Sequence, residues 1–100
     1  MLLNEEELAV GLAGLAGWVR EGASITRQRS FSDFPAALAF VNQVGDAAEA
    51  ADHHPDIRLY DWNKVELKLT THSESGLTSK DLELASKIEA ILSASSGDDI

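Results

Sequence analysis

The sequence predicts an α+β domain in which three helices pack on one face of a four-stranded antiparallel sheet. Helical and strand-like patterns of apolar residues follow one another in the order α-β-β-α-β-β-α. One strand alternates cleanly between apolar and polar residues, which is typical of a sheet with one buried face. The length of 100 residues fits a single domain, residues 1–100, with one core.

The first helix is predicted over residues 4–16. Asn4 is a suitable N-cap, and the three glutamates that follow it suit the partially positive start of a helix. Leucines recur at helical spacing and are expected to face the core: Leu8, Leu12 and Leu15. Glycines weaken this helix, so we expect it to depend on packing.

Two strands, Trp18–Glu21 and Ile25–Phe31, are predicted next, around a turn at Gly22-Ala23. Ser32-Asp33-Phe34-Pro35 then predicts the start of a long helix, because a capping residue is followed by a proline in the first turn. This helix is expected to run to about Asp52. Its predicted apolar face consists of Phe34, Leu38, Val41 and Ala48.

Residues 56–60 predict a short strand, and a longer strand follows from the alternation after position 63. Its apolar positions are Val65, Leu67, Leu69 and Thr71, and its polar positions are Lys64, Glu66, Lys68 and Thr70. Thr78 to Asp81 read as a capping box that opens the last helix. The apolar stripe of that helix is Leu82, Ala85, Ile88 and Leu92, and residues 93–100 are expected to form a flexible tail.

The chain has 8 basic and 17 acidic residues, a formal net charge of −9. This balance argues against direct nucleic-acid binding, which usually needs a basic patch. The absence of cysteine excludes disulfides, thiolate metal sites and cysteine nucleophiles, and it suits a cytoplasmic protein. No apolar run is long enough to span a bilayer, so we expect no membrane partner.

All three histidines, His53, His54 and His72, fall between positions 49 and 81. Histidine suits proton transfer near neutral pH because its ordinary pKa is about 6.5. Pro55 disfavours a helical backbone at His54, so the long helix is expected to break beside the histidine pair. The break would let adjacent histidines approach one ligand, and His72 could reach the same space from the end of a strand. The pattern therefore predicts a proton-transfer site or a metal site.

Structural roles compete with functional ones at the neighbouring positions. Asp81 is fully explained as the N3 residue of a capping box. Trp18 and Trp62 fit core or edge packing, and Glu49 fits a solvated helix face. A zinc site of three histidines is a further alternative. Such ligands are often one turn apart on a helix or two residues apart on a strand, and this chain shows neither spacing.

As a set, these residues resemble the signature of the pterin-4a-carbinolamine dehydratase family. The positions that carry the resemblance are Glu49, His53-His54-Pro55, Trp62, His72 and Asp81. It extends to Gly17-Trp18, Phe31-Ser32-Asp33-Phe34, Asn63-Lys64-Val65 and Gly76-Leu77-Thr78, and covers the chain from about Leu8 to Ile91. The resemblance implies the same α+β architecture.

The resemblance also implies an activity, the dehydration of 4a-hydroxytetrahydropterin to quinonoid dihydropterin. This reaction recycles the cofactor of aromatic amino acid hydroxylases. The family implies a pterin substrate, no metal or organic cofactor, and a homodimer or homotetramer.

Site residues are carried over by position. The expected catalytic residues are His53, His54 and His72; His53 and His72 resemble the acid–base pair, and His54 looks more like a substrate-binding histidine. The expected substrate-binding residues are Asp52, His53, His54, Thr70, Thr71 and His72. The expected supporting residues are Glu49, Trp18, Trp62 and Asp81.

A different class of function is the alternative. In some lineages the same fold serves as a protein-binding module, including a transcriptional coactivator and an assembly factor for a carbon-fixing enzyme. Because a fold does not determine function, a non-catalytic or combined role is compatible with the architecture. The presence of all three histidines favours the enzyme.

Overall fold

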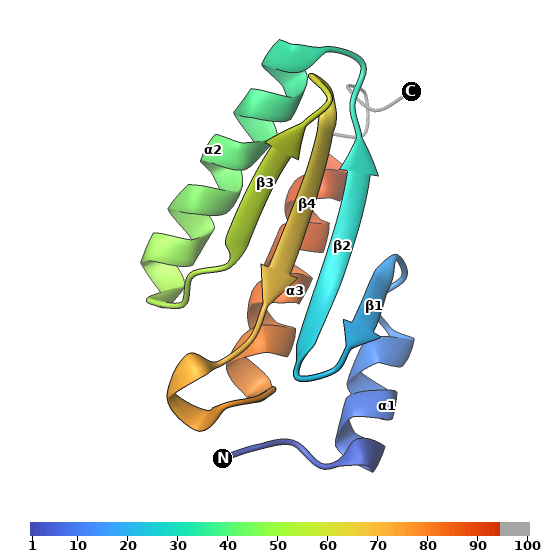
Figure 1. The fold of residues 1–100 in the computed structure, drawn as a ribbon, viewed down its shortest axis with the longest axis vertical. Coiled ribbons are helices and arrows are strands. Elements are labelled where there is room, and N and C mark those ends of the chain that lie inside the picture. The colour runs from blue at the N-terminus through green and yellow to red at the C-terminus, as the bar shows by residue number, and fades with distance from the viewer. Residues whose placement is uncertain (95–100) are drawn as a thin grey trace.

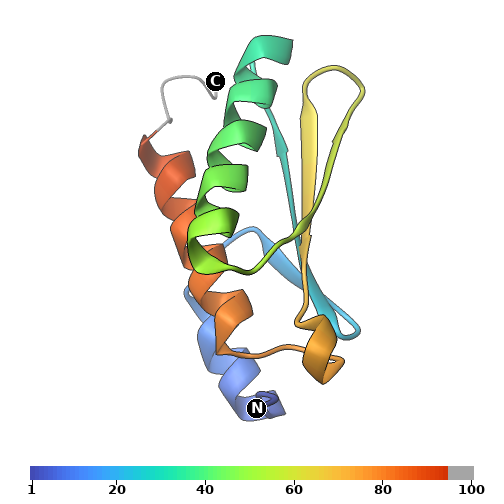
Figure 2. The same ribbon diagram turned by 90° about the vertical axis from the view of Figure 1, so that its left-hand side faces the viewer.

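The computed structural model describes residues 1–94 of the chain. Its elements are α1 (Glu5–Ala13), β1 (Trp18–Glu21), β2 (Ser24–Ser30), α2 (Phe34–Ala51), β3 (Asp56–Tyr60), β4 (Lys64–Leu69), the 3₁₀ turn η1 (His72–Glu74) and α3 (Ser79–Ala94). The three helices cover one face of the sheet, as Figures 1 and 2 show from two sides. The predicted fold class and the order of elements are confirmed.

The sheet has the strand order β1-β2-β4-β3, and every neighbouring pair is antiparallel. The two central strands, β2 and β4, are connected through α2 and β3. Asp56, the first residue of β3, pairs with Lys68 near the end of β4. The segment between α2 and β3 and the segment after β4 therefore lie at the same end of the sheet (Figure 1). The three histidines are in these two segments.

The core lies between the sheet and the helices. Its most deeply buried side chains include Ile25, Leu67, Leu69, Leu84 and Ile88. The predicted apolar residues of α1 and α3 are buried or half-buried in this core, and Leu84 is an additional core residue of α3. Asn4 caps α1 as predicted, and Glu7 completes a capping box with it.

The predicted core face of α2 is wrong in its first half. Phe34 and Leu38 are 46% and 43% exposed, whereas the buried stripe is Ala37, Phe40, Val44 and Ala48. Apolar residues occupy both stripes in the first two turns, so the sequence pattern does not distinguish them. Phe40, in the buried stripe, packs against Phe31 with ring centroids 5.0 Å apart. This aromatic contact favours burial of the stripe that contains Phe40.

Several boundaries differ from the predicted ones. Helix α1 ends at Ala13, because Gly14 forms its C-cap. Strand β4 ends at Leu69, and His72 opens a 3₁₀ turn instead of ending a strand. Helix α3 continues to Ala94, two residues into the predicted tail, and residues 95–100 lie outside the described residues.

The outer face of the sheet is polar, as the alternation in β4 predicts. Glu66 accepts hydrogen bonds from Gln28 Nε2 at 3.0 Å and from Arg58 Nε at 3.2 Å. These hydrogen bonds lower the pKa of the Glu66 carboxyl, because they favour its ionised form. Among residues 1–94, no helix is both long and apolar enough to cross a membrane.

Candidate active site

The adjacent histidines follow a left-handed turn at the end of α2. The helix ends at Ala51, and Asp52 has φ 51° and ψ 44°. The N–H of Asp52 donates to Glu49 O, and the N–H of His53 donates to Ala48 O at 3.1 Å. These are the two hydrogen bonds of a Schellman C-cap. The predicted break of the helix is therefore confirmed, and it begins at Asp52 before Pro55 adds its own restriction.

The ring of His53 is buried and meets Asp81 in the first turn of α3. His53 Nε2 lies 2.6 Å from Asp81 Oδ1. The side chain of His53 is 10% exposed and that of Asp81 is 0% exposed. A hydrogen bond of this length to a buried carboxylate is of the strong, charge-assisted kind. It joins the end of α2 to the start of α3.

The second carboxylate oxygen of Asp81 binds the segment that follows β4. Asp81 Oδ2 accepts hydrogen bonds from Thr71 Oγ1 at 2.8 Å and from the Thr78 N–H at 2.9 Å. Because the Thr71 hydroxyl proton is used on Asp81, Thr78 Oγ1 donates to Thr71 Oγ1 across 2.8 Å. Thr78 Oγ1 in turn accepts from the N–H of Lys80 at 3.2 Å. Asp81 thus acts both as the predicted capping residue of α3 and as the partner of His53.

This network determines which ring nitrogen of His53 is available to a ligand. An ionised Asp81 can only accept hydrogen bonds, so with the carboxylate charged the proton between Oδ1 and His53 Nε2 belongs to Nε2. No buried side-chain nitrogen or oxygen within residues 1–94 lacks a partner, and His53 makes this one side-chain hydrogen bond. Nδ1 of His53 is therefore not fully buried, and it is the ring nitrogen left for a ligand.

His54 points to a different partner. Its Nε2 lies 2.5 Å from Glu49 Oε2, and the two side chains are 56% and 79% exposed. Glu49 is on the last turn of α2, so its contact with His54 links the residues before and after the left-handed turn at Asp52. Glu49, predicted from sequence as a supporting residue, thus contacts one of the predicted catalytic histidines.

His72 is the first residue of η1 and directly follows Thr71, which shares Asp81 with His53. Its side chain is exposed and makes no hydrogen bond or ion pair with any residue in the described part of the chain. The structure thus brings the backbone of His72 to the Asp81 network and leaves its imidazole available to a ligand.

Three other predicted site residues are not part of the Asp81 network. Thr70 Oγ1 donates to Ala23 O in the β1–β2 turn at 2.7 Å. Trp18 is buried and donates its indole N–H to Glu89, eight residues and about 12 Å along α3 from Asp81. Trp62 is 56% exposed in the β3–β4 turn, at the opposite end of β3 from the histidines (Figure 1).

A charged cluster that sequence reasoning did not identify surrounds the Trp18 contact. Glu89 Oε2 accepts from Trp18 Nε1 at 2.8 Å and from Arg27 Nε at 2.9 Å. Burial lowers the pKa of the neighbouring Arg29, and the positive charge of Arg27 lowers it further. The alternation of β2 places both arginines on the face of the sheet that the helices cover. The sequence signal for this cluster was that two charged residues occupy strand positions where the alternation calls for apolar ones.

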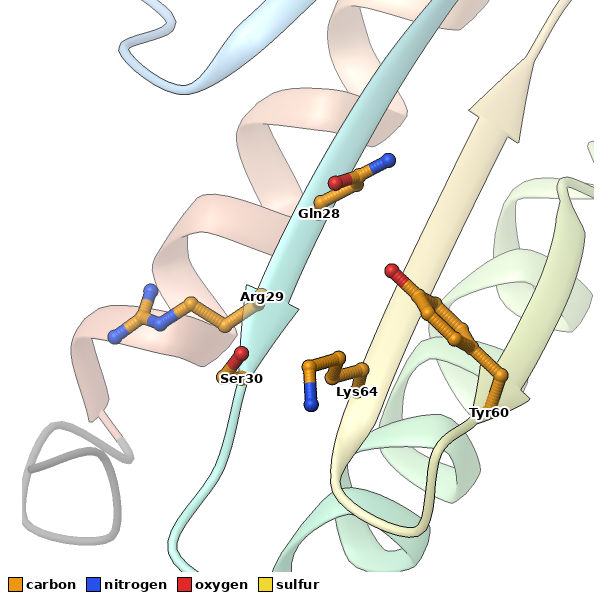
Figure 3. Close-up of a pocket in the computed structure, with 5 residues that line it drawn as sticks. All are labelled: Gln28, Arg29, Ser30, Tyr60 and Lys64. Atoms are coloured by element: carbon orange, nitrogen blue, oxygen red, sulfur yellow. The ribbon is translucent and has the colours of Figure 1, made fainter.

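Two shallow hollows lie beside the outer face of the sheet, away from the histidines. One, of about 340 Å³, is lined by Gln28, Arg29, Ser30, Tyr60 and Lys64 (Figure 3). In Figure 3 the Arg29 side chain points away from Tyr60 and Lys64. The other hollow, of about 440 Å³, lies beside β1 and β2. Neither contains a predicted catalytic histidine.

The alternative of a metal site finds no geometric support in the histidines. Within residues 1–94, no group of three or more histidine, cysteine, aspartate or glutamate side chains is arranged to hold a metal ion. His53 and His54 instead pair with separate carboxylates, Asp81 and Glu49.

The fold and this network define a class of protein, a small α+β domain with an aspartate-bound histidine next to a second histidine-bearing segment. Residues 1–91 match the family model described as pterin 4 alpha carbinolamine dehydratase. The chain belongs to this family.

Individual relatives agree with this assignment. The chain is 47% identical to a protein of Roseiflexus castenholzii, with 91% of this chain and 97% of that protein covered. It is 49% identical to a protein of Acidobacterium capsulatum, with coverages of 90% and 97%. Both relatives are provisionally named pterin-4-alpha-carbinolamine dehydratases.

Two solved structures share the fold. A transcriptional coactivator/pterin dehydratase from Brucella melitensis superposes with a TM-score of 0.85 at 39% identity, covering 91% of this chain and 98% of that chain. A pterin dehydratase-like protein, identified as a RuBisCO assembly factor in the alpha-carboxysome, superposes with a TM-score of 0.59. At 15% identity over 73% of this chain and 83% of that chain, the second likeness concerns the fold alone.

The left-handed turn at Asp52 allows its structural role to be separated from its predicted role in substrate binding. Asp52→Gly should leave the melting temperature unchanged or slightly raised, because glycine is the residue preferred at this position of a Schellman motif. If the carboxylate also contacts substrate, KM should rise while the fold is retained. Thermal melts and steady-state kinetics of the variant test both statements. A clear fall in the melting temperature would contradict the structural part.

Proposed function

We propose that this protein dehydrates a 4a-hydroxytetrahydropterin to the quinonoid dihydropterin by histidine acid–base catalysis. The observation that carries the proposal is the hydrogen-bonded chain from His53 through Asp81 to Thr71, the neighbour of His72. It links the two segments that family resemblance marks as pterin-binding. Membership of the dehydratase family supports the same reaction.

The chemistry requires two proton transfers. The bond between C4a and its hydroxyl oxygen breaks after that oxygen gains a proton, and water leaves. The adjacent ring nitrogen loses its proton, and its electron pair forms the new double bond to C4a. The two transfers balance, so the step needs no oxidant or reductant.

We assign these transfers to His53 and His72. Asp81 holds His53 by Nε2, so Nδ1 is the nitrogen that exchanges the proton with the pterin. His72 supplies the second transfer from an imidazole that is exposed and unpaired among the described residues. A positioned acid or base typically contributes on the order of 10²-fold to 10⁴-fold to the rate. His54, oriented by Glu49, would bind the substrate.

The direct test is a stopped-flow measurement of the dehydration of 4a-hydroxytetrahydropterin generated by a hydroxylase. We expect the protein to accelerate the step above its rate in buffer, in proportion to protein concentration. Untagged protein treated with a chelator should retain the activity. A rate equal to that in buffer would disprove the proposal.

Further proposals follow from the family. We propose that the reaction recycles the cofactor of an aromatic amino acid hydroxylase in the cytoplasm, with no cofactor of its own, and that the protein acts as a homodimer or homotetramer. Light scattering tests the oligomeric state, and a monomer at assay concentration would contradict it. The Brucella melitensis protein is described as a coactivator as well as a dehydratase, so a combined role remains the alternative function.

A further inference from the structure

The loop that carries His72 is closed at its base by a short antiparallel bridge. The Thr71 N–H donates to Gly76 O at 2.9 Å, and the Gly76 N–H donates to Thr71 O at 3.3 Å. On one side, Asp81 holds this loop through Thr71 and Thr78. The Asp81 network therefore fixes the residues on both sides of the loop, but it does not contact residues 72–76.

The other side of the loop is covered by the first three residues of the chain, which lie at the same end of the molecule (Figure 1). The Leu3 N–H donates to Leu77 O at 2.9 Å. The backbone nitrogen of Met1 donates to Glu74 Oε2 at 2.8 Å. A methyl group of Leu2, Cδ2, lies over Gly76, only 2.9 Å from the position that a Cβ on this glycine would take.

We propose that residues 1–3 hold the His72 loop in place, and that Leu2 and Leu3 are positioning residues for His72. This inference rests on the proposed function. The contacts are sequential, from residues 1, 2 and 3 to residues 74, 76 and 77, so the segment lies along the loop. A catalytic imidazole must be held within a fraction of an ångström, because a displacement of about 1 Å can lower the rate about 100-fold.

Leu2 is the more informative residue to change. Leu3 packs against the hydrophobic core, so its replacement would also disturb α1. Leu2 is 50% exposed, so Leu2→Ala removes the contact with Gly76 and little of the core. We expect its kcat to fall about threefold to tenfold with little change in KM, because the ring is displaced and substrate binding is retained.

Hydrogen exchange supplies a readout that does not depend on activity. In Leu2→Ala, the amide of Gly76 should exchange about fivefold faster than in the parent protein, since the loop opens locally more often. Leu2→Met should restore both the exchange rate and kcat, because a long apolar side chain again covers the glycine. The matched control is Val10→Ala, which truncates a 72% exposed apolar side chain on α1 and should change neither quantity.

A double-mutant cycle isolates the contact itself. Gly76→Ala pushes against the Leu2 methyl group in the parent protein but not in Leu2→Ala. The two changes should therefore combine less than additively in exchange and in log kcat.

The possible outcomes are distinct. Exchange and kcat in Leu2→Ala equal to those in Val10→Ala would overturn the inference. Faster exchange with an unchanged kcat would overturn the positioning role, because the segment would then only stabilise the loop. If the parent protein proves inactive, the proposed function fails, and the exchange rates alone decide whether residues 1–3 hold the loop.

Discussion

Asp81→Asn is expected to lower the free energy of unfolding by about 3 kcal/mol, because it removes one of the two acceptor oxygens of a fully buried carboxylate and leaves a buried donor unpaired. The carboxylate accepts hydrogen bonds from three donors, His53 Nε2, Thr71 Oγ1 and the Thr78 N–H. An asparagine at this position has one acceptor oxygen, so its amide N–H₂ must face at least one of these donors. One domain of this size should then melt about 12–24 °C lower.

The same substitution is expected to lower kcat by about 100-fold or more at a temperature where the variant is folded. Without a carboxylate at Nε2, His53 loses the hydrogen bond that fixes both its ring orientation and its tautomer. Nδ1 then no longer presents a defined lone pair or proton to the pterin. Substrate binding by His54 does not involve Asp81, so KM should change less than kcat.

Chemical denaturation, and single-turnover kinetics well below the melting temperature, separate the two effects. Asp33→Asn is the matched control, because Asp33 caps α2 by accepting the Ala36 N–H at 2.8 Å at an exposed position. Asparagine caps a helix about as well as aspartate, so this control should change stability by less than about 0.5 kcal/mol. An Asp81→Asn variant that behaves like the control would contradict the role assigned to the buried carboxylate.

Local sequence patterns predicted the elements of the fold because each pattern reports one physical constraint. The Asn4 cap, the proline in the first turn of α2 and the alternation in β4 all appear as predicted. The buried face of α2 was misassigned because both of its first-turn stripes are apolar. Which of them faces the sheet depends on the packing of Phe40 against Phe31, a contact between distant elements.

The sequence yields a list of candidate site residues but not the contacts among them. Capping rules explained Asp81 completely, and nothing local in the sequence indicates that His53, 28 residues earlier, uses the same carboxylate. The left-handed conformation of Asp52 likewise has no strong local signal, because glycine is the usual residue there. The contact of residues 1–3 with the His72 loop depends on how α1 docks, which a periodic pattern does not encode.

His53→Ala and His72→Ala are each expected to lower kcat by about 100-fold to 10⁴-fold, since each removes one of the two proton transfers. The double variant should lose less than the product of the two single losses. The two histidines act as a unit, so once one proton transfer is lost, the remaining histidine contributes less to the rate and its removal costs less.

The comparison of the two single variants also tests the geometry. His53 is bound to a buried aspartate, whereas the exposed His72 has no side-chain partner among residues 1–94. His53→Ala should therefore also lower stability, by about 2–3 kcal/mol, because it leaves the Asp81 carboxylate without a donor at Oδ1. His72→Ala should leave the melting temperature within a few degrees of the parent value.

The cycle requires rapid-mixing kinetics of the parent, both single variants and the double variant, with thermal melts of all four. Gln43→Ala, on an exposed position of α2, provides the control for a truncated surface side chain. Strict additivity of the losses in log kcat would indicate that the two imidazoles act independently. It would then count against a shared proton-transfer site, even if each single variant were strongly impaired.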